Sequence, residues 1–555
     1  MKISNFILKH LKVLILPIIP TTIVLTSCNK DYLKEFIAKL EKEDNLQSIK
    51  TFKLTNSSEQ YLVYCHNNSL EKLMHDSYKT NGYINDIYQN TAMVRNVETF
   101  SNNFGTFIKA SDNATGETNY NQIWVRDSVW GYKKLINDND NNSKAKAKKV
   151  LLSLLDYYST PKQINRLKTA ISNPYLVLSN KQGNMNAVHI RFDASTLDDV
   201  QIDGKDELWN HKQNDALGFL LSELIIAIDN KNITFDDLNQ ANGAIANSTK
   251  RIDTIVYLFA YLNALNYYQM PDSGAWEENE AVRTSSIGLV TNAEERLYEY
   301  MNNSITDTDR NRFIEAYNLL MLNNNYQNYC SLEVLPRYIS EGYKTIKILI
   351  DNGGECTGYD KSNENYREAD AALLNLIYPC SLNNLDNSYK LKILEIINDS
   401  LVSPAGIKRY LNDTYQSANF WFNNIKTNVN EGETAKKREK SFIPNTEASW
   451  FFDSWYAICC LKEFNDPNTT SQQKNNLEDS LYKFLNRSIG QISQVDNYIA
   501  NGKKIETVSF PESYNIIYKN KNEYWYIASV IDNLNWAKST FSILLESLLQ
   551  NALPI

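Results

Sequence analysis

The sequence predicts an all-α protein whose helices close into a toroid, an α/α barrel. Glycine is scarce, at 18 of 555 residues, and long apolar segments recur. This composition favours helices over tight β-turns. Roughly a dozen segments have helical character, and short turns alternate with longer polar loops between them. Because the chain shows no strong sequence repeat of about 20–50 residues, the alternation favours a toroid over a solenoid. In a toroid the long loops gather at one end and build the site.

The expected helices follow from apolar residues spaced three and four apart. Leu217, Leu220, Leu221, Leu224 and Ile228 show this spacing, whereas residues 255–267 are apolar nearly all round and must be buried. In chain order, helices are expected at 126–137, 143–157, 162–171, 213–230, 248–269, 284–302, 307–324, 336–350, 368–377, 388–400, 446–463, 472–491 and 526–549.

Three other stretches are expected to be non-helical or exposed. Residues 50–64 allow a strand or two, and residues 102–121 have the Asn, Gly, Thr and Ser content of a loop. The charged span 427–440 lacks apolar periodicity and predicts an exposed excursion, with a partner-binding tail as the alternative.

Residues 1–27 have the features of a signal peptide and are excluded from the fold. Three lysines precede or border an apolar stretch at 13–25 that is too short for a secure membrane span. Leu25-Thr-Ser-Cys28 resembles a bacterial lipobox, which implies that Cys28 becomes the lipidated first residue of a mature lipoprotein. The protein would then be anchored in the cell membrane on its extracytoplasmic face. The alternative is an ordinary signal peptide or anchor with an incidental cysteine.

Composition excludes some classes of function. The net charge is −8 and no basic stripe occurs, which argues against nucleic-acid binding. With five histidines and no Cys-x-x-Cys spacing, the chain predicts no metal site, and no cofactor is expected. Most of the cysteines beyond Cys28 are expected to be free and buried.

The stretch that carries most of the chemistry is Trp276-Glu277-Glu278, which follows turn residues and precedes a predicted helix. A carboxyl group beside an aromatic surface loses solvation, and its pKa rises. A glutamic acid with a raised pKa suits general acid catalysis near neutral pH. The alternative is the first turn of a helix, where the helix dipole favours acidic residues.

Six such clusters recur in loops at the starts of predicted helices. Each pairs an indole or phenol with carboxylates, arginine or amides, a mixture that suits the apolar faces and hydroxyls of a sugar. Taken singly, each cluster also has a structural interpretation, such as a core aromatic, an N-cap or an ion pair. The clusters are Trp124 with Arg126 and Asp127, Trp209 to Asp215, Trp276 to Glu278, Gly406 to Tyr415, Glu447 to Trp450, and Phe510 to Tyr514 with Asn535 and Trp536.

The ordered set of clusters resembles glycoside hydrolase family 15, the glucoamylases, and the related barrel of the phosphorylase kinase α and β subunits. Trp124-Val-Arg-Asp-Ser is similar to the family's W-x-R-D-S, Trp276-Glu-Glu to its W-E-E, and Arg409-Tyr410 to Tyr415 to its R-Y-x-x-D-x-Y. Further matching segments are Trp209-Asn-His-Lys-Gln-Asn-Asp, Pro444 to Trp450, Phe510-Pro-Glu-Ser-Tyr and Leu534-Asn-Trp536.

The resemblance covers residues 96–555 and implies an (α/α)₆ catalytic barrel, preceded by a tether and short segment at 28–95. It implies an inverting mechanism that releases glucose from the ends of α-glucans or maltooligosaccharides. Glu277 would be the general acid and Glu512 the general base. An inverting enzyme holds two such carboxyls roughly 6.5–9.5 Å apart. The implied sugar-binding residues are Arg126, Asp127 and Arg409, and the implied pocket wall is Trp209, Trp276, Glu278, Trp450 and Trp536.

Departures from the family pattern bear on the substrate more than on the fold. Lys538 places a charge near the expected pocket wall, and Trp209 is followed by Asn-His where fungal enzymes have Pro-Arg. The N-terminal β-sandwich of bacterial relatives is expected to be absent, since residues 29–95 are too few. Two other functions stay open: a non-catalytic carbohydrate-binding or regulatory relative, and a substrate-capturing lipoprotein for sugar uptake. Neither needs the pair Glu277 and Glu512.

Overall fold

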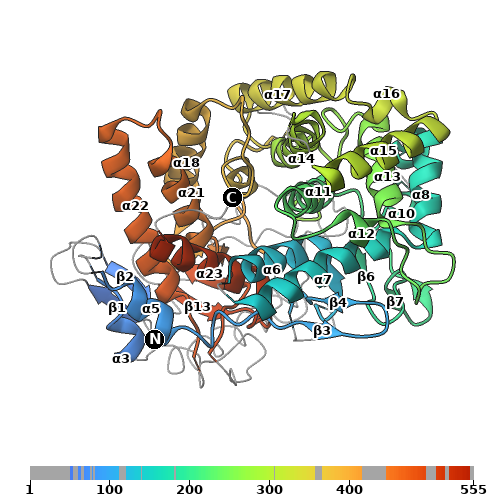
Figure 1. The fold of residues 1–555 in the computed structure, drawn as a ribbon. Coiled ribbons are helices and arrows are strands. Elements are labelled where there is room, and N and C mark those ends of the chain that lie inside the picture. Colours follow the sequence, from blue (N-terminus) through green and yellow to red (C-terminus); the bar gives the residue numbers. More distant parts are fainter. Residues whose placement is uncertain are drawn as a thin grey trace, which may run out of the picture.

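The computed structural model shows a mostly helical protein (Figure 1). The predicted lipidation site at Cys28 and the charged span 427–440 lie outside the part of the chain that the structure describes. The described residues are 50–53, 60–63, 68–75, 78, 82–111, 120–138, 140–179, 183–304, 307–356, 366–415, 445–494, 508–518 and 524–550.

Six helical elements form a closed inner ring. Each contacts the next in chain order, and the last packs against the first. The ring consists of α6 (Val125–Asn137), α11 (Asn214–Asp229), α14 (Thr284–Asn302), the 3₁₀ helix η1 (Ala371–Leu376), α21 (Asp453–Asn465) and α23 (Asn535–Gln550).

An outer helix precedes each inner element along the chain, so that six helical hairpins build the toroid. Each outer helix packs against one or two members of the inner ring. The predicted all-α toroid is therefore confirmed, and its form is the (α/α)₆ barrel. The outer helices are α5 (Ile84–Asn90), α7 (Asn141–Tyr158), α13 (Arg251–Ala264), α17 (Leu335–Asn352), α18 (Asn387–Leu401) and α22 (Ser471–Gly490).

Further helices lie outside the twelve elements of the barrel. Of these, α8 begins with Thr160 as N-cap and Pro161 at the first helical position, an arrangement that favours a helix start. Within the described residues, the remaining helices are α3 (Asn68–Glu71), α8 (Pro161–Ser172), α9 (Tyr175–Leu178), α10 (Gly183–Asn186), α12 (Phe235–Leu238), α15 (Thr308–Asn323) and α16 (Gln327–Cys330).

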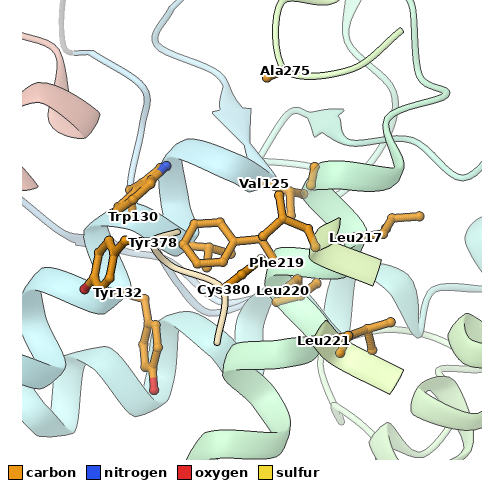
Figure 2. Packing of buried hydrophobic residues seen from close by; sticks show 14 of the residues in the cluster. Val125, Trp130, Tyr132, Leu217, Phe219, Leu220, Leu221, Ala275, Tyr378 and Cys380 are labelled. Atoms are coloured by element: carbon orange, nitrogen blue, oxygen red, sulfur yellow. The ribbon is translucent and has the colours of Figure 1, made fainter. Parts of the chain in front are cut away.

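The interior of the ring is filled by large side chains. Trp130 of α6 is fully buried, and its indole lies 5.9 Å from that of Trp536 and 5.7 Å from that of Trp455, centroid to centroid. Figure 2 shows Trp130 near Phe219 of α11 and Tyr378. Such packing of aromatic rings fills the barrel below the loops.

A five-stranded antiparallel sheet is the main feature that the sequence pattern did not predict. Its strand order is β13-β12-β11-β10-β9. The predicted helices 446–463 and 526–549 are wrong in their first residues, which form strands β11 and β13. Both strands pair with β12, for example Ala448 with Asn515 and Asn515 with Ile527. The strands are β9 (Val402–Ser403), β10 (Gly406–Ile407), β11 (Thr446–Trp450), β12 (Ser513–Tyr518) and β13 (Tyr524–Ala528).

Four small strand pairs lie elsewhere in the described part of the chain. The pair β1–β2 confirms the strands expected within residues 50–64. The pair β5–β6 holds Trp124 opposite Arg191 beside the start of α6. The pairs are β1 (Lys50–Lys53) with β2 (Gln60–Val63), β3 (Phe100–Ser101) with β4 (Thr106–Phe107), β5 (Ile123–Trp124) with β6 (Arg191–Phe192), and β7 (Gln201–Ile202) with β8 (Lys205–Asp206).

The segment before residue 96 packs against the barrel. The amide of His75 donates to Oδ1 of Asn486 on α22 at 3.1 Å, and Nδ2 of Asn486 donates back to the His75 carbonyl at 3.0 Å. Helix α5 packs against α23 as the first outer helix. The expected boundary at residue 96 therefore falls after the first element of the toroid.

The described cysteines are free and buried, as expected: Cys330, Cys356, Cys380, Cys459 and Cys460. Within the described ranges, no helix is both long and apolar enough to cross a bilayer.

Candidate active site

A cavity opens to solvent where the inner helices begin, and its empty space, the open mouth included, is about 620 Å³. Its lining residues come from the loops and first turns of α6, α11, α21 and α23, and from the loop before α14. Nine of the ten residues predicted for the site lie in its wall. The lining is Ala110, Tyr120, Trp124, Arg126, Asp127, Trp209, Ala275, Trp276, Glu277, Arg409, Tyr415, Trp450, Glu512, Leu534 and Trp536.

Glu277 lies at the tip of a tight loop and is 7% exposed. Its φ of 59° is left-handed, a conformation that costs a non-glycine residue about 1–3 kcal/mol. The loop is held by Asn210, whose Nδ2 donates to the Glu277 carbonyl at 2.7 Å. Burial raises the pKa of Glu277, while Arg126, with Nη1 3.8 Å from Glu277 Oε1, opposes that rise.

Glu512 lies in a bend directly before β12 and is 3% exposed. Its amide donates to the Ile531 carbonyl at 2.7 Å, which fixes the bend. The Tyr120 hydroxyl donates to Oε1 of Glu512, while Oε2 has no hydrogen-bond partner among the described residues. Burial raises the pKa of Glu512 to about 8, against the lowering effect of the Tyr120 hydrogen bond.

Two arginines line the cavity, and each is fixed by its own aspartate. Nε of Arg126 donates to Asp215 at 2.6 Å, where Asp215 sits in the first turn of α11. Arg409 makes a two-pronged contact with Asp413, with Nε and Nη2 at 2.7 and 2.9 Å from the carboxylate oxygens. Planar paired contacts of this kind hold a guanidinium rigidly. Asp127 lies beside Arg126, and burial raises its pKa to about 7.

Indoles form the apolar part of the wall. Trp276 stacks on Trp536, with ring centroids 6.2 Å apart and planes 16° apart. Trp450 donates from Nε1 to Asp413 at 3.0 Å, so the carboxylate that fixes Arg409 also fixes this ring. Trp124 and Trp209 meet edge to face at 6.2 Å. Indole faces next to fixed guanidinium and carboxyl groups suit a polar ligand with apolar faces.

Glu278 is the one predicted pocket residue that does not line the cavity. Its exposed fraction is 0%, and it is not among the lining residues. The Arg367 guanidinium and the Tyr410 hydroxyl both donate to its carboxylate. Glu278 is held away from the cavity because Arg367, which lies in none of the predicted motifs, supplies a buried cation beside its carboxylate. Lys538 is buried on α23 and is also absent from the cavity wall.

Tyr120 and Arg191 are site features that sequence reasoning missed. Tyr120 stood inside a predicted loop with no distinguishing neighbours, and only the fold brings its hydroxyl to Glu512. Arg191 lies between two wall indoles, with its guanidinium 4.6 Å from the Trp124 ring and 4.2 Å from the Trp209 ring. Its charge also opposes the rise in the pKa of Glu277 that burial causes. Groups of histidine, cysteine or acidic residues able to hold a metal ion do not occur among the described residues.

A six-hairpin toroid with carboxyl, guanidinium and indole groups around a cavity at the starts of its inner helices defines a glycoside hydrolase fold. Residues 82–299 match Glycosyl hydrolases family 15, and the chain belongs to this family. The structure superposes on the glucoamylase of Saccharomycopsis fibuligera with a TM-score of 0.50 at 15% identity, covering 91% of this chain and 99% of that one.

Two proteins of Escherichia coli strain K12 are similar in sequence. The uncharacterized lipoprotein YgeQ is 41% identical over 219 residues, which cover 38% of this chain and 78% of that protein. The putative protein YgeP is 46% identical over 56 residues, or 10% of this chain and 57% of that protein.

Proposed function

We propose that the protein is an exo-acting, inverting glycoside hydrolase that releases glucose from the non-reducing ends of α-glucans or maltooligosaccharides. The observation that carries the proposal is the presence of Glu277 and Glu512 in one cavity wall, from loops far apart in sequence. Both are buried carboxyls with raised pKa values, the condition under which such groups exchange protons near neutral pH.

In the proposed reaction Glu277 donates its proton to the glycosidic oxygen as the bond from that oxygen to the anomeric carbon breaks. Glu512 accepts a proton from a water molecule whose oxygen attacks the anomeric carbon from the opposite face. The products are a shortened glucan and a glucose of inverted configuration. Glu277 must be protonated and Glu512 ionised when the reaction begins.

The charge of the cavity favours a neutral substrate. The guanidinium groups of Arg126 and Arg409 are already matched by Asp215 and Asp413. Asp127, Glu277 and Glu512 add further acidic groups to the wall. An anionic sugar would therefore meet an excess of carboxyl groups, while both arginines of the described wall are already paired with aspartates. A neutral hexose instead offers hydroxyls to both kinds of group.

The direct test is the release of glucose from a panel of neutral α-glucosides, including maltose, maltotriose, isomaltose and trehalose, by the purified mature protein. The proposal expects release from at least the maltooligosaccharides, one glucose at a time from the non-reducing end. On longer maltooligosaccharides, early products other than glucose and the chain shortened by one unit would contradict exo-action. Release only from isomaltose or trehalose would be compatible with the proposed mechanism but would mean that the enzyme cleaves a different glycosidic linkage.

One observation favours a non-catalytic carbohydrate-binding protein as the second candidate. With a pKa of about 8, Glu512 is mostly protonated at neutral pH and is then a poor base. The two candidates separate by pH, because catalysis requires ionised Glu512 and simple binding does not. A protein that binds maltotriose in calorimetry but releases no glucose at any pH from about 5 to 9 is a binding protein.

The pH profile is a testable consequence of the environment of Glu512. The folded-state pKa is raised, so the ionised form accumulates only as pH rises towards 8, and the acidic limb of the kcat/KM profile should lie above the pH range of an ordinary glutamate. Tyr120 lowers this pKa through its hydrogen bond. Tyr120→Phe should therefore move the acidic limb to higher pH. Steady-state kinetics across pH measures the limb, and an unmoved limb would mean that another group controls it.

We also propose that Cys28 anchors the protein in the membrane by a lipid, in agreement with the name of the lipoprotein YgeQ. In cells expressing the full chain, Cys28→Ala should shift the protein from the membrane fraction to the soluble or unprocessed pool. It should also abolish incorporation of labelled palmitate. Cys330→Ala, at a buried thiol of the barrel, is the control and should change neither result. Labelling that survives Cys28→Ala would place the lipid elsewhere.

A further inference from the structure

Two buried histidines that the proposed reaction does not use are stacked on each other. His189 lies two residues before β6, and His211 lies in the segment 207–213, which forms neither helix nor strand. The ring centroids are 3.4 Å apart and the ring planes 10° apart. Both residues are buried, with exposed fractions of 0% and 4%. The stack therefore joins two loops that are far apart in sequence.

Helix α8 fixes the ring of His189. The His189 amide donates to Oε1 of Gln163 at 3.1 Å, and Nδ1 lies 2.7 Å from Oδ1 of Asp199. Asp199 is held in turn by Arg166, with guanidinium contacts of 3.0 and 2.7 Å, and by Lys162 at 2.8 Å. Because Gln163, Arg166 and Lys162 all belong to α8, this ring has a fixed place in the fold.

The neighbours of His211 on both sides hold the loop that carries Glu277. Asn210 donates from Nδ2 to the Glu277 carbonyl at 2.7 Å. The carbonyl of Lys212 accepts from the amide of Ser273 at 2.7 Å, at the start of the same loop. A shift of His211 would therefore move the backbone around Glu277.

The ring of His211 is itself held by the stack. Its Nδ1 is buried and has no hydrogen-bond partner among the described residues. The His211 amide donates to the Trp209 carbonyl at 3.1 Å, within the same segment. The ring face on His189 is thus what connects this segment to α8.

We propose that His211 is a positioning residue for Glu277, whose ring, stacked on His189, holds the segment 209–212 and with it the loop of the general acid. The proposal rests on the proposed function, because Glu277 is taken as the acid. Glu277 has a left-handed φ of 59°, a conformation that persists only where the surroundings fix it. Misplacing a catalytic group by about 1 Å can cost on the order of 10²-fold in rate.

The stack requires uncharged rings. Burial lowers the pKa of His189, and it lowers the pKa of His211 well below the usual range. At His211 the neighbouring ring and nearby cations lower the pKa further, against the opposing effect of a carboxylate. Two neutral rings can then pack face to face near pH 7. The charged groups around the pair come from α8, β6 and the loop after β6, and are Lys162, Arg166, Arg191 and Asp199.

The test compares His211→Gln, which removes the ring face, with His211→Phe, which keeps it. Cleavage of maltotriose needs the proton of Glu277 on the leaving oxygen, whereas the fluoride of α-glucosyl fluoride leaves with little help from an acid. His211→Gln should lower kcat about 10²-fold on maltotriose but less than about fivefold on α-glucosyl fluoride. His211→Phe should keep kcat on both substrates within about threefold of the wild type.

His75→Gln is the matched control, because His75 stacks on Tyr83 with ring centroids 3.9 Å apart and neither residue lines the cavity. It should leave kcat on both substrates unchanged. Equal losses on the two substrates in His211→Gln would indicate general loosening of the fold and would overturn the positioning role, as would unchanged rates. A folded His211→Phe variant as impaired as His211→Gln would also overturn it, since the ring face would then not matter.

A second measurement decides the structural role without catalysis. In the wild type, histidine side-chain NMR should show His189 and His211 mostly neutral at about pH 6.5, where an ordinary histidine is half protonated. Hydrogen exchange of the amides at 273–281 should be faster in His211→Gln than in the wild type or in His75→Gln. A mostly protonated ring in the pair, or unchanged exchange, would overturn the proposal. If the wild type cleaves neither substrate while exchange behaves as expected, the proposed function fails and the structural role of the stack stands.

Discussion

Glu277→Gln is expected to lower kcat by about 10²–10⁴-fold, the contribution typical of a positioned acid–base group. Glutamine keeps the shape of the protonated carboxyl but has no proton to give to the leaving oxygen. Because burial already favours the neutral form of Glu277, the variant should fold normally. Steady-state kinetics on maltotriose and a thermal unfolding curve measure the two effects.

The control for this variant lies on the same loop. Glu280 pairs with Lys212 and is absent from the cavity wall. Glu280→Gln should keep kcat within about threefold, which would show that loss of a loop carboxylate alone is not the cause. Near-normal turnover by Glu277→Gln would refute the assignment of the acid.

Glu512→Gln is expected to show a loss of similar size, about 10²–10⁴-fold in kcat, because glutamine cannot accept the proton of the attacking water. The acceptor atom for the Tyr120 hydroxyl remains in the variant, so the hydrogen bond in the wall is kept. A rate within tenfold of wild type would exclude Glu512 as the base.

The same variant has a predicted effect on stability with a definite sign. The folded-state pKa of Glu512 is raised from 4.5 to about 8, so the folded protein binds more protons than the unfolded chain between these values. The free energy of unfolding therefore falls as pH rises through this window. Glu512→Gln removes this dependence, and its Tm should exceed that of the wild type at pH 8 by more than at pH 5. An equal difference at both pH values would mean that the carboxyl is not shifted.

The helices of the barrel could be predicted because their apolar faces are periodic. The spacing of leucines in α11 is visible in the sequence, and the helix spans Asn214–Asp229 against an expected 213–230. Strands β11 and β13 could not be predicted, because short buried stretches show no period that separates a strand from the start of a helix. Their structure depends on pairing with β12, an interaction between distant segments.

In the candidate site, too, some features could be predicted from local sequence and others depend on distant segments. Trp124, Arg126, Trp276 and Glu277 stand in short motifs whose chemistry is visible in order along the chain. The environment of Glu278 is set by Arg367 and Tyr410, which are 89 and 132 positions away. Tyr120 reaches Glu512 across 392 positions. The burial of Glu278 and Glu512 and the contacts with their partners arise when the ring closes. No local sequence pattern predicts them.

The most direct test of the proposed mechanism is the configuration of the glucose first released from maltotriose, followed by proton NMR before the anomers equilibrate. General acid catalysis by Glu277 with water activated by Glu512 predicts β-glucose as the initial product, since attack occurs on the face opposite the leaving group. Initial α-glucose would contradict the inverting mechanism.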